Sequence, residues 1–174
     1  ANTPNPFDWQ SIPEKEDQIS MRLGHSVNME WSPQTVALKR FAELVAIYTD
    51  NHIKPSIFPG SQLGSEKEML QQARQGMLQV TIPATNNMAQ VAPSMNLLML
   101  PYLTQSTEEN NYLLDELTPI LNPRVIEESG VRIVGWENTG WRHFFYNSEN
   151  PIEGPDDLAE LNMRVPPNPI MLGT

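Results

Sequence analysis

Two hydrophobic periods alternate along the first half of the chain, and this alternation restricts the fold more than any other feature. Apolar residues at every second position from Ile19 to Leu23 predict a strand that ends near His25. Residues 53–58 and 78–82 predict two further strands, and helical spacing fills the intervals between the strands. An order of strand, helix, strand, helix, strand predicts an α/β fold in which helices flank a mostly parallel sheet.

Both predicted helices carry signals for where they begin and end. Ser32 followed by Pro33 is typical of an N-cap and a first helical residue. Ser65 and Glu68 have the spacing of a capping box, and Gly76 is expected to end that second helix. The buried face of the first helix is expected to hold apolar residues at helical spacing, namely Ala37, Phe41, Leu44, Val45 and Tyr48.

The rest of the chain predicts shorter elements. Residues 84–94 are expected to form a loop, and Thr107 is expected to cap a helix that is apolar on one side. Pro123 and Gly130 are expected to bound another short helix, and Pro155 is expected to begin one more. Strands are expected at residues 131–136, 141–146 and 163–165, and the apolar residues 170–172 are expected to start a new element.

Composition argues against several classes of function. A net charge of -10 and an isoelectric point near 4.6 disfavour binding to nucleic acid or to anionic membrane surfaces. No apolar run reaches the length of about 20 residues that a helix needs to span a bilayer. The chain has no cysteine, and its three histidines lack the spacing of metal ligands. We therefore expect no disulfide, no metal site and no cofactor.

Two arginines stand out in this acidic chain. Arg142 lies in the stretch Trp141-Arg142-His143-Phe144, and Arg164 lies in Met163-Arg164-Val165-Pro166-Pro167. A guanidinium group binds both oxygens of a carboxylate in a planar fork. This pair predicts that the protein holds a small organic acid. The alternative is that both arginines are surface ion-pair partners of the many acidic residues.

Polar residues follow two of the predicted strands. His25, Ser26 and Asn28 come after the first strand, and Thr85 and Asn86 come after the third. Loops at the carboxyl ends of strands in open parallel sheets line the ligand crevice. These residues therefore predict hydroxyl and amide contacts to a polar ligand. Ordinary turn chemistry is the alternative.

Several short stretches occur in one order along the chain. They are Met21-Arg22-Leu23-Gly24-His25, residues 40–45, residues 58–68, Leu100-Pro101-Tyr102-Leu103, residues 140–144, Pro151-Ile152 with residues 155–158, and Met163-Arg164-Val165-Pro166. In this order the chain resembles the solute-binding proteins of tripartite ATP-independent periplasmic (TRAP) transporters, of the dicarboxylate-binding type. The resemblance extends from about residue 19 to the end of the chain.

The resemblance implies a periplasmic-binding-protein-like fold of type II, with two α/β lobes that close on a carboxylate. Residues 1–18 would be an N-terminal extension, residues 19–138 the first lobe, and residues 139–174 the crossover and the start of a second lobe that continues further. Because a cut at this place leaves apolar surface exposed, it would favour dimers.

The resemblance also assigns roles to site residues. Arg164 would pair with the ligand carboxylate, and Arg142 would add a second charged contact. Thr85 and Asn86 would supply polar contacts, and the loop from Ser26 to Trp31 would line the same cleft. Some members carry an acid in the loop after the third strand, and its absence here disfavours a ligand like sialic acid.

The implied function is non-enzymatic: capture of an organic acid in the periplasm and delivery to a TRAP permease, after removal of a secretory leader. A sensor subunit that presents a carboxylate to a signalling receptor is one alternative. An enzyme using His25 or His143 for acid–base chemistry is another. The ligand stays open among C4-dicarboxylates, 2-oxo acids, sugar acids and aromatic acids, and Trp31 and Trp141 would either stack on a ring or pack.

Overall fold

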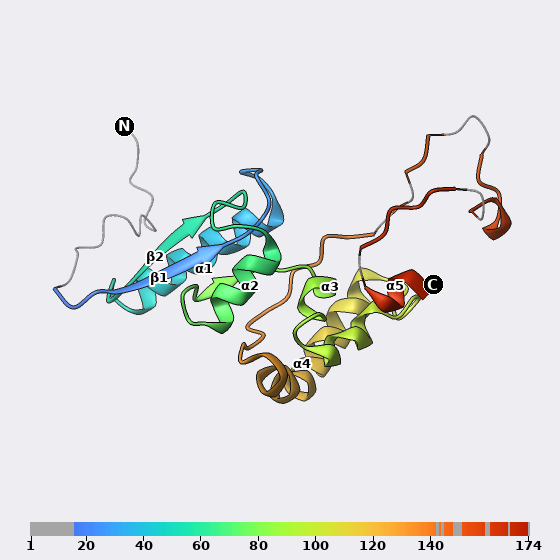
Figure 1. Ribbon diagram of the computed structural model, residues 1–174. Helices are drawn as coiled ribbons and strands as arrows, with labels where there is room; N and C mark the ends of the chain where they lie inside the picture. The colour runs from blue at the N-terminus through green and yellow to red at the C-terminus, as the bar shows by residue number, and fades with distance from the viewer. Residues whose placement is uncertain are drawn as a thin grey trace.

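The central sheet is parallel, as the sequence predicts. The computed structural model describes residues 16–141, 143, 145–147, 151–158, 161–166 and 168–173. Within these residues, the sheet has three strands in the order β2-β1-β3, which are β1 (Ile19–Gly24), β2 (Ile53–Phe58) and β3 (Val80–Thr81) (Figure 1). Gly24 pairs with both Phe58 and Thr81, so the carboxyl ends of the strands lie at one edge. The three strands predicted within residues 19–82 are confirmed, and the third is shorter than expected.

Helices α1 (Pro33–Tyr48) and α2 (Glu66–Arg74) cover opposite faces of this sheet (Figure 1). Both predicted starts are confirmed: Ser32 accepts from the backbone N–H of Thr35, and Ser65 and Glu68 form a reciprocal capping box. α2 lies close to the sheet, because Gly24 has no side chain there. A Cβ atom at Gly24 would lie 2.9 Å from the Met69 sulfur.

The buried face of α1 differs from the prediction. The residues below the sheet are Thr35, Leu38, Ala42 and Ala46, whereas Ala37 is exposed and Tyr48 is 82 % exposed. Phe41, Leu44 and Val45 are only half-buried. Apolar residues occur on more than one side of this helix, so helical spacing alone allows several faces. The face with two alanines is the one that packs closely on the strands.

A second core lies beyond β3. Helix α3 (Thr85–Met88) and the 3₁₀ helix η2 (Pro93–Met99) occupy much of residues 84–94, where we predicted a loop. They pack with α2 against α4 (Thr107–Ser129). The buried residues of this core are Leu70, Met88, Ala89, Ala92, Met95, Leu121 and Val125. The loop prediction fails because an apolar stripe makes these short turns part of a core.

Helix α4 is continuous, so the predicted break at Pro123 is wrong. Its N-cap is Ser106, whose side chain accepts from Glu109 N, and not Thr107. Each internal proline removes one backbone donor. The helix nevertheless continues to Gly130, the predicted end, which has a left-handed φ of 75°. Burial of the α4 face that carries Leu121 outweighs the lost hydrogen bonds.

Residues 131–136 run along α4 as extended chain and do not form the predicted strand. Asn122 on α4 takes the place of a strand partner: its Oδ1 accepts from Ile133 N at 2.8 Å, and its Nδ2 donates to Ile133 O at 3.0 Å. Trp136 Nε1 also donates to Thr118 Oγ1 at 2.6 Å. The described part of the chain pairs no strand with this segment, and an extended chain is a strand only when a second backbone pairs with it.

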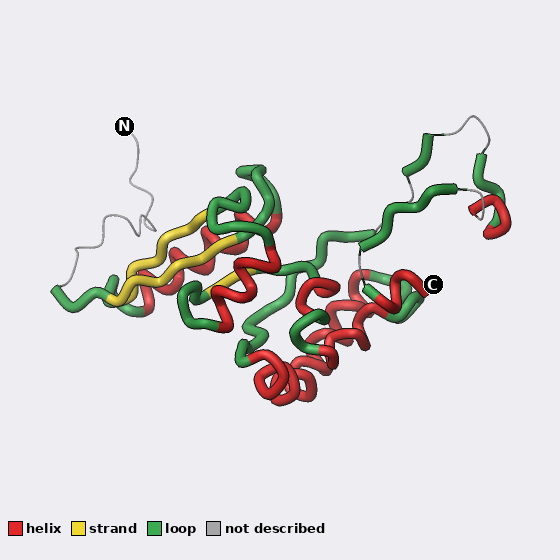
Figure 2. The backbone as a smooth tube through the Cα atoms, viewed as in Figure 1, coloured by secondary structure: helices red, strands yellow, loops and turns green. Residues whose placement is uncertain are grey.

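The described residues of the predicted strands 141–146 and 163–165 are also loop (Figure 2). Pro155 begins a short helix as predicted, the 3₁₀ helix η3 (Pro155–Leu158), and α5 (Pro169–Gly173) is the new element expected near residue 170. Next to α5, Asn168 Nδ2 donates to Asn96 Oδ1 of η2 at 3.0 Å. None of the described helices is long and apolar enough to span a membrane.

Candidate functional site

The loops after the strands form a hydrogen-bonded layer at the carboxyl edge of the sheet. We call them the carboxyl-edge loops: residues 25–31, 59–64 and 82–87, the last of which includes the start of α3. The first two are joined through their backbones, because Gly60 N donates to Val27 O at 3.0 Å and Ser61 N donates to His25 O at 3.1 Å. Gly60 and Ser61 have left-handed φ angles of 59° and 61°. This pair of left-handed residues turns the second loop back against the first.

Gly60 also meets the first loop at close range. A Cβ atom at this position would lie 3.0 Å from the side chain of Asn28. A glycine is therefore needed here both for its φ angle and for the space that Asn28 occupies. Gly60 therefore lies directly against the side chain of Asn28, which is one of the predicted ligand-binding residues.

Glu66, the first residue of α2, fastens the first carboxyl-edge loop to the third. Its Oε1 accepts from Ser26 Oγ at 2.7 Å. Its Oε2 accepts from Ala84 N at 2.8 Å and from Asn87 Nδ2 at 2.7 Å. Sequence reasoning missed this role. The available signal was an acid in the first turn of a capped helix that follows the carboxyl end of a parallel strand. The helix dipole favours a carboxylate at this position.

His25 lies inside the protein on the α1 side of the sheet and is 0 % exposed. Its Nε2 lies 3.3 Å from Thr35 Oγ1, and its Nδ1 has no hydrogen-bond partner among the described residues. Burial lowers the pKa of His25 below the usual value, because desolvation disfavours the charged imidazolium. The predicted site residue is therefore a neutral ring beneath the first loop.

The other predicted contacts occupy both buried and exposed positions. Thr85 begins α3, and Asn86 is 7 % exposed and donates through Nδ2 to Asn87 Oδ1 at 3.3 Å. Asn28 is exposed, and Trp31 is 86 % exposed at the end of the first loop. The carboxyl-edge loops therefore combine a fastened interior with amide and indole groups at the surface.

Arg164, one of the two predicted arginines, is not joined to these loops. Arg164 is exposed in the loop before α5 and has no hydrogen-bond or ion-pair partner in the described part of the chain. Arg142 lies outside the described residues. The structure thus brings Ser26 and the Thr85 loop together through Glu66, and leaves Arg164 apart from them.

The charge of the carboxyl-edge loops limits what they bind. They contain the acid Glu30 and no lysine or arginine. The carboxylate of Glu66 adds a second negative charge beside them. Such an edge suits hydrogen bonding to the hydroxyl groups of a ligand, and the anionic end of an acid requires a cation from another segment.

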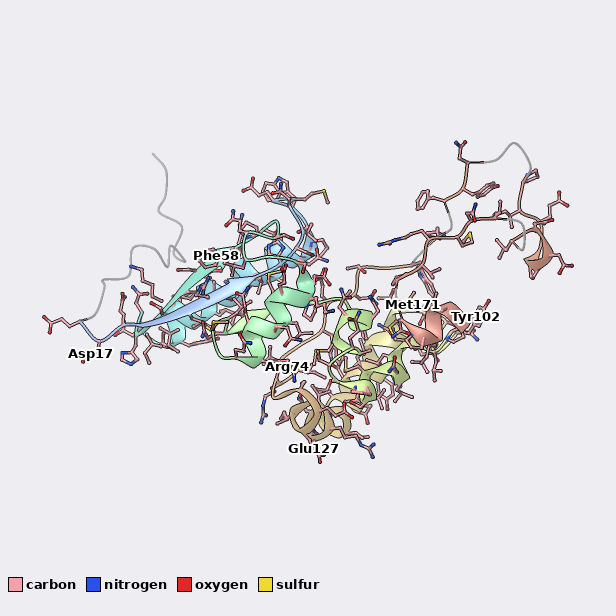
Figure 3. All side chains as sticks on the ribbon, in the orientation of Figure 1. Asp17, Phe58, Arg74, Tyr102, Glu127 and Met171 are labelled. Carbon is pink, nitrogen blue, oxygen red and sulfur yellow. The ribbon has the colours of Figure 1, made fainter. Side chains whose placement is uncertain are left out.

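A groove of about 310 Å³ adjoins this site between α2 and α3, and its walls include Lys67, Arg74 and Asn87. Arg74, labelled in Figure 3, is already engaged in holding α2 to the end of α4. Its Nε donates to Ser129 O at 3.1 Å, and its Nη1 donates to Gln71 Oε1 at 3.2 Å. The groove arginine therefore has a structural role.

Residues 23–174 match the model of the family described as bacterial extracellular solute-binding protein, family 7. The 2,3-diketo-L-gulonate-binding periplasmic protein of Escherichia coli is 30 % identical over 151 residues, which are 87 % of this chain and 45 % of that protein. The chain thus spans about half the length of the relatives that it matches.

Solved structures of TRAP periplasmic solute-binding proteins are also similar to this chain. A TRAP periplasmic solute-binding protein from Rhodobacter sphaeroides, in an open ligand-free state, is 37 % identical with a TM-score of 0.74, over 86 % of this chain and 48 % of that one. A TRAP periplasmic solute-binding protein from Chromohalobacter salexigens with bound D-glucuronate is 27 % identical with a TM-score of 0.77, over 85 % of this chain and 48 % of that one.

Proposed function

Because the chain belongs to the bacterial extracellular solute-binding proteins of family 7, we propose that it captures a small organic acid in the periplasm and delivers it to a TRAP membrane permease. The observation that carries this proposal is the carboxyl edge, whose three loops are joined to one another by hydrogen bonds within the chain. A pre-organised edge binds without the entropic cost of ordering its loops. The TRAP proteins among the similar structures support the permease as the partner.

The charge of the edge favours a sugar acid over a simple dicarboxylate. A dicarboxylate is bound best with a cation near each end, and the carboxyl-edge loops carry none. A sugar acid needs a cation at one end only, and its hydroxyl groups match the amide, hydroxyl and carboxylate groups of the edge. Two similar proteins, one with bound D-glucuronate and one that binds 2,3-diketo-L-gulonate, support this class.

In the proposed mechanism, Arg164 binds the ligand carboxylate in a bidentate pair and Arg142 adds a second charge-assisted bond. Thr85 and Asn86 orient the hydroxyl groups from the first lobe, residues 19–138. The arginines belong to residues 139–174, which begin the second lobe. A ligand that contacts both lobes favours the closed state over the open one, and this difference in affinity drives hinge closure.

The test is titration calorimetry on the intact protein with D-glucuronate. Arg164→Ala is expected to weaken binding about tenfold or more, because a hydrogen bond to a charged group contributes about 1.5–3 kcal/mol. Arg124→Ala, which removes an exposed arginine on α4, is the matched control and is expected to bind as the wild type does. Unchanged affinity in Arg164→Ala would overturn the role of this residue.

Two further ligands test the substrate class. Succinate is expected to bind more weakly than D-glucuronate, because the edge offers no second cation. Glucose is expected to bind more weakly still, because it has no carboxylate. Equal binding of glucose and glucuronate would contradict the arginine mechanism, and failure to bind any acid would refute the proposed function.

A further inference from the structure

Thr35 is the centre of a buried hydrogen-bond cluster beneath the first carboxyl-edge loop. Its hydroxyl oxygen donates to Met29 O at 2.8 Å. The same oxygen lies 2.8 Å from Ser32 Oγ and 3.3 Å from His25 Nε2. Met29 belongs to the loop, His25 begins it, and Thr35 lies in the first turn of α1 at 5 % exposure. One hydroxyl group therefore connects both ends of the loop to a helix.

The contacts of Thr35 favour one arrangement of protons. A threonine hydroxyl has one proton, and Thr35 gives it to Met29 O. The oxygen can then only accept from its other neighbours. In this arrangement, all three contacts of the Thr35 hydroxyl are hydrogen bonds when His25 carries a proton on Nε2 and Ser32 donates its hydroxyl proton to Thr35. The neutral imidazole with a proton on Nε2 is the form that completes this cluster.

A second proton on His25 has no place in the cluster. Its Nδ1 is buried and, within the described residues, has no hydrogen-bond partner. Burial is the cause of the lowered pKa of His25, and no neighbouring charge contributes to it. The charged side chains on β1, β2, α1 and the loop itself are Arg22, Lys54, Lys39, Arg40, Glu43 and Glu30. Glu30 pairs with Lys39 at 3.3 Å, and Glu43 pairs with Arg40 at 2.6 Å, so both carboxylates are engaged away from the ring.

We propose that Thr35 is a positioning residue that holds residues 25–31 in their binding conformation, through a latch that requires His25 to be neutral. The latch consists of Thr35, Met29, Ser32 and His25. Acid opens it, because an imidazolium would bring an unpaired charge into a buried site. The latch consists of contacts within the chain, and only its effect on ligand affinity rests on the proposed function.

The test is hydrogen exchange, read by mass spectrometry on peptides from residues 25–32 of the intact, ligand-free protein. Exchange is measured at about pH 7.5 and about pH 5.5, which lie on either side of the ordinary histidine pKa of about 6.5. The measured rates are corrected for intrinsic exchange. Thr35→Val removes the hydroxyl at nearly constant shape, and Thr35→Ser keeps it. His25→Gln keeps a donor near the position of Nε2 and does not titrate. Peptides from β2 and α4 are the internal controls.

Thr35→Val is expected to exchange about fivefold or more faster in residues 25–32 at the higher pH, which corresponds to the loss of one typical hydrogen bond. The β2 and α4 peptides are expected to stay at wild-type rates, and Thr35→Ser is expected to restore protection of the loop. In the wild type, protection of the loop is expected to fall on acidification, and in His25→Gln it is expected to stay constant.

Three results would each overturn the latch. One is wild-type loop protection in Thr35→Val. Another is equal loosening of β2 and α4 in that variant, which would mean a loss of stability of the whole fold. The third is an acid-dependent loss that persists in His25→Gln, and this arm does not require the valine variant to fold. Because no ligand is present, none of these results bears on the proposed function.

Discussion

Replacing Glu66 by alanine is expected to release the third carboxyl-edge loop from the first and to destabilise the fold. The carboxylate accepts hydrogen bonds from Ser26 Oγ, Ala84 N and Asn87 Nδ2 at 2.7–2.8 Å. At about 1.5–3 kcal/mol for each hydrogen bond to a charged group, the three together would contribute about 4.5–9 kcal/mol if water did not compensate for their loss. Glu66 is half-buried, so water replaces part of this loss. We therefore expect Glu66→Ala to lower the free energy of unfolding by about 2–3 kcal/mol.

Glu66→Gln separates geometry from charge. The glutamine oxygen still accepts from Ala84 N and Asn87 Nδ2 where Oε2 does now. The glutamine amide then faces Ser26, whose hydroxyl oxygen is able to accept. All three contacts survive without the negative charge. Because charge-assisted hydrogen bonds are stronger than neutral ones, we expect a smaller loss, of about 1 kcal/mol.

Urea unfolding followed by circular dichroism measures both variants against the wild type, and calorimetry with a sugar acid measures their affinity. The expected order of stability is wild type, glutamine, alanine, and affinity is expected to follow the same order. A loss below about 0.5 kcal/mol in Glu66→Ala, the usual range for surface substitutions, would refute the fastening role. Equal losses in both variants would show that charge, and not the hydrogen bonds, carries the effect.

Two further substitutions test the backbone and the core by urea unfolding. Gly60→Ala is expected to cost about 1–2 kcal/mol, because its φ of 59° is left-handed, and a wild-type midpoint would contradict this reading. Leu121→Ala is expected to cost about 2–5 kcal/mol, because the side chain is 3 % exposed in the core on α4. The neighbouring Ile120→Ala, at 63 % exposure, is its matched control, and similar losses in both would show that this face of α4 is misassigned.

Local signals in the sequence predicted the elements of the sheet and the helices beside it. Ser32 and Ser65 began the helices where their side chains accept backbone protons, and residues 53–58 formed the predicted strand. These features depend on neighbours within a few residues, so the sequence contains most of the information. The parallel order followed because a helix lies between each pair of strands.

Contacts distant in sequence escaped prediction. The strand predicted at residues 131–136 met Asn122 of α4 and not another strand, and the break predicted at Pro123 was overridden by core packing. Glu66 was missed for the same reason, because its partners Ser26 and Asn87 lie 40 and 21 residues away. Sequence patterns report which residues are polar or apolar, and they do not report which distant group each will meet.

The two halves of the proposed site have different physical requirements. Hydroxyl groups are recognised by short hydrogen bonds, which need atoms held in place, and Glu66, Gly60 and the Thr35 latch hold the carboxyl-edge loops. A carboxylate is recognised by charge, which acts over a longer range, but the chain as a whole carries -10 and repels anions at a distance. In the proposed mechanism, an exposed arginine such as Arg164 gains most when closure brings it and the ligand out of water, where an ion pair is less screened. The proposed site therefore combines a fixed edge that binds hydroxyl groups with a separate cation that approaches on closure. Together, these two parts would select an acid that carries both kinds of group.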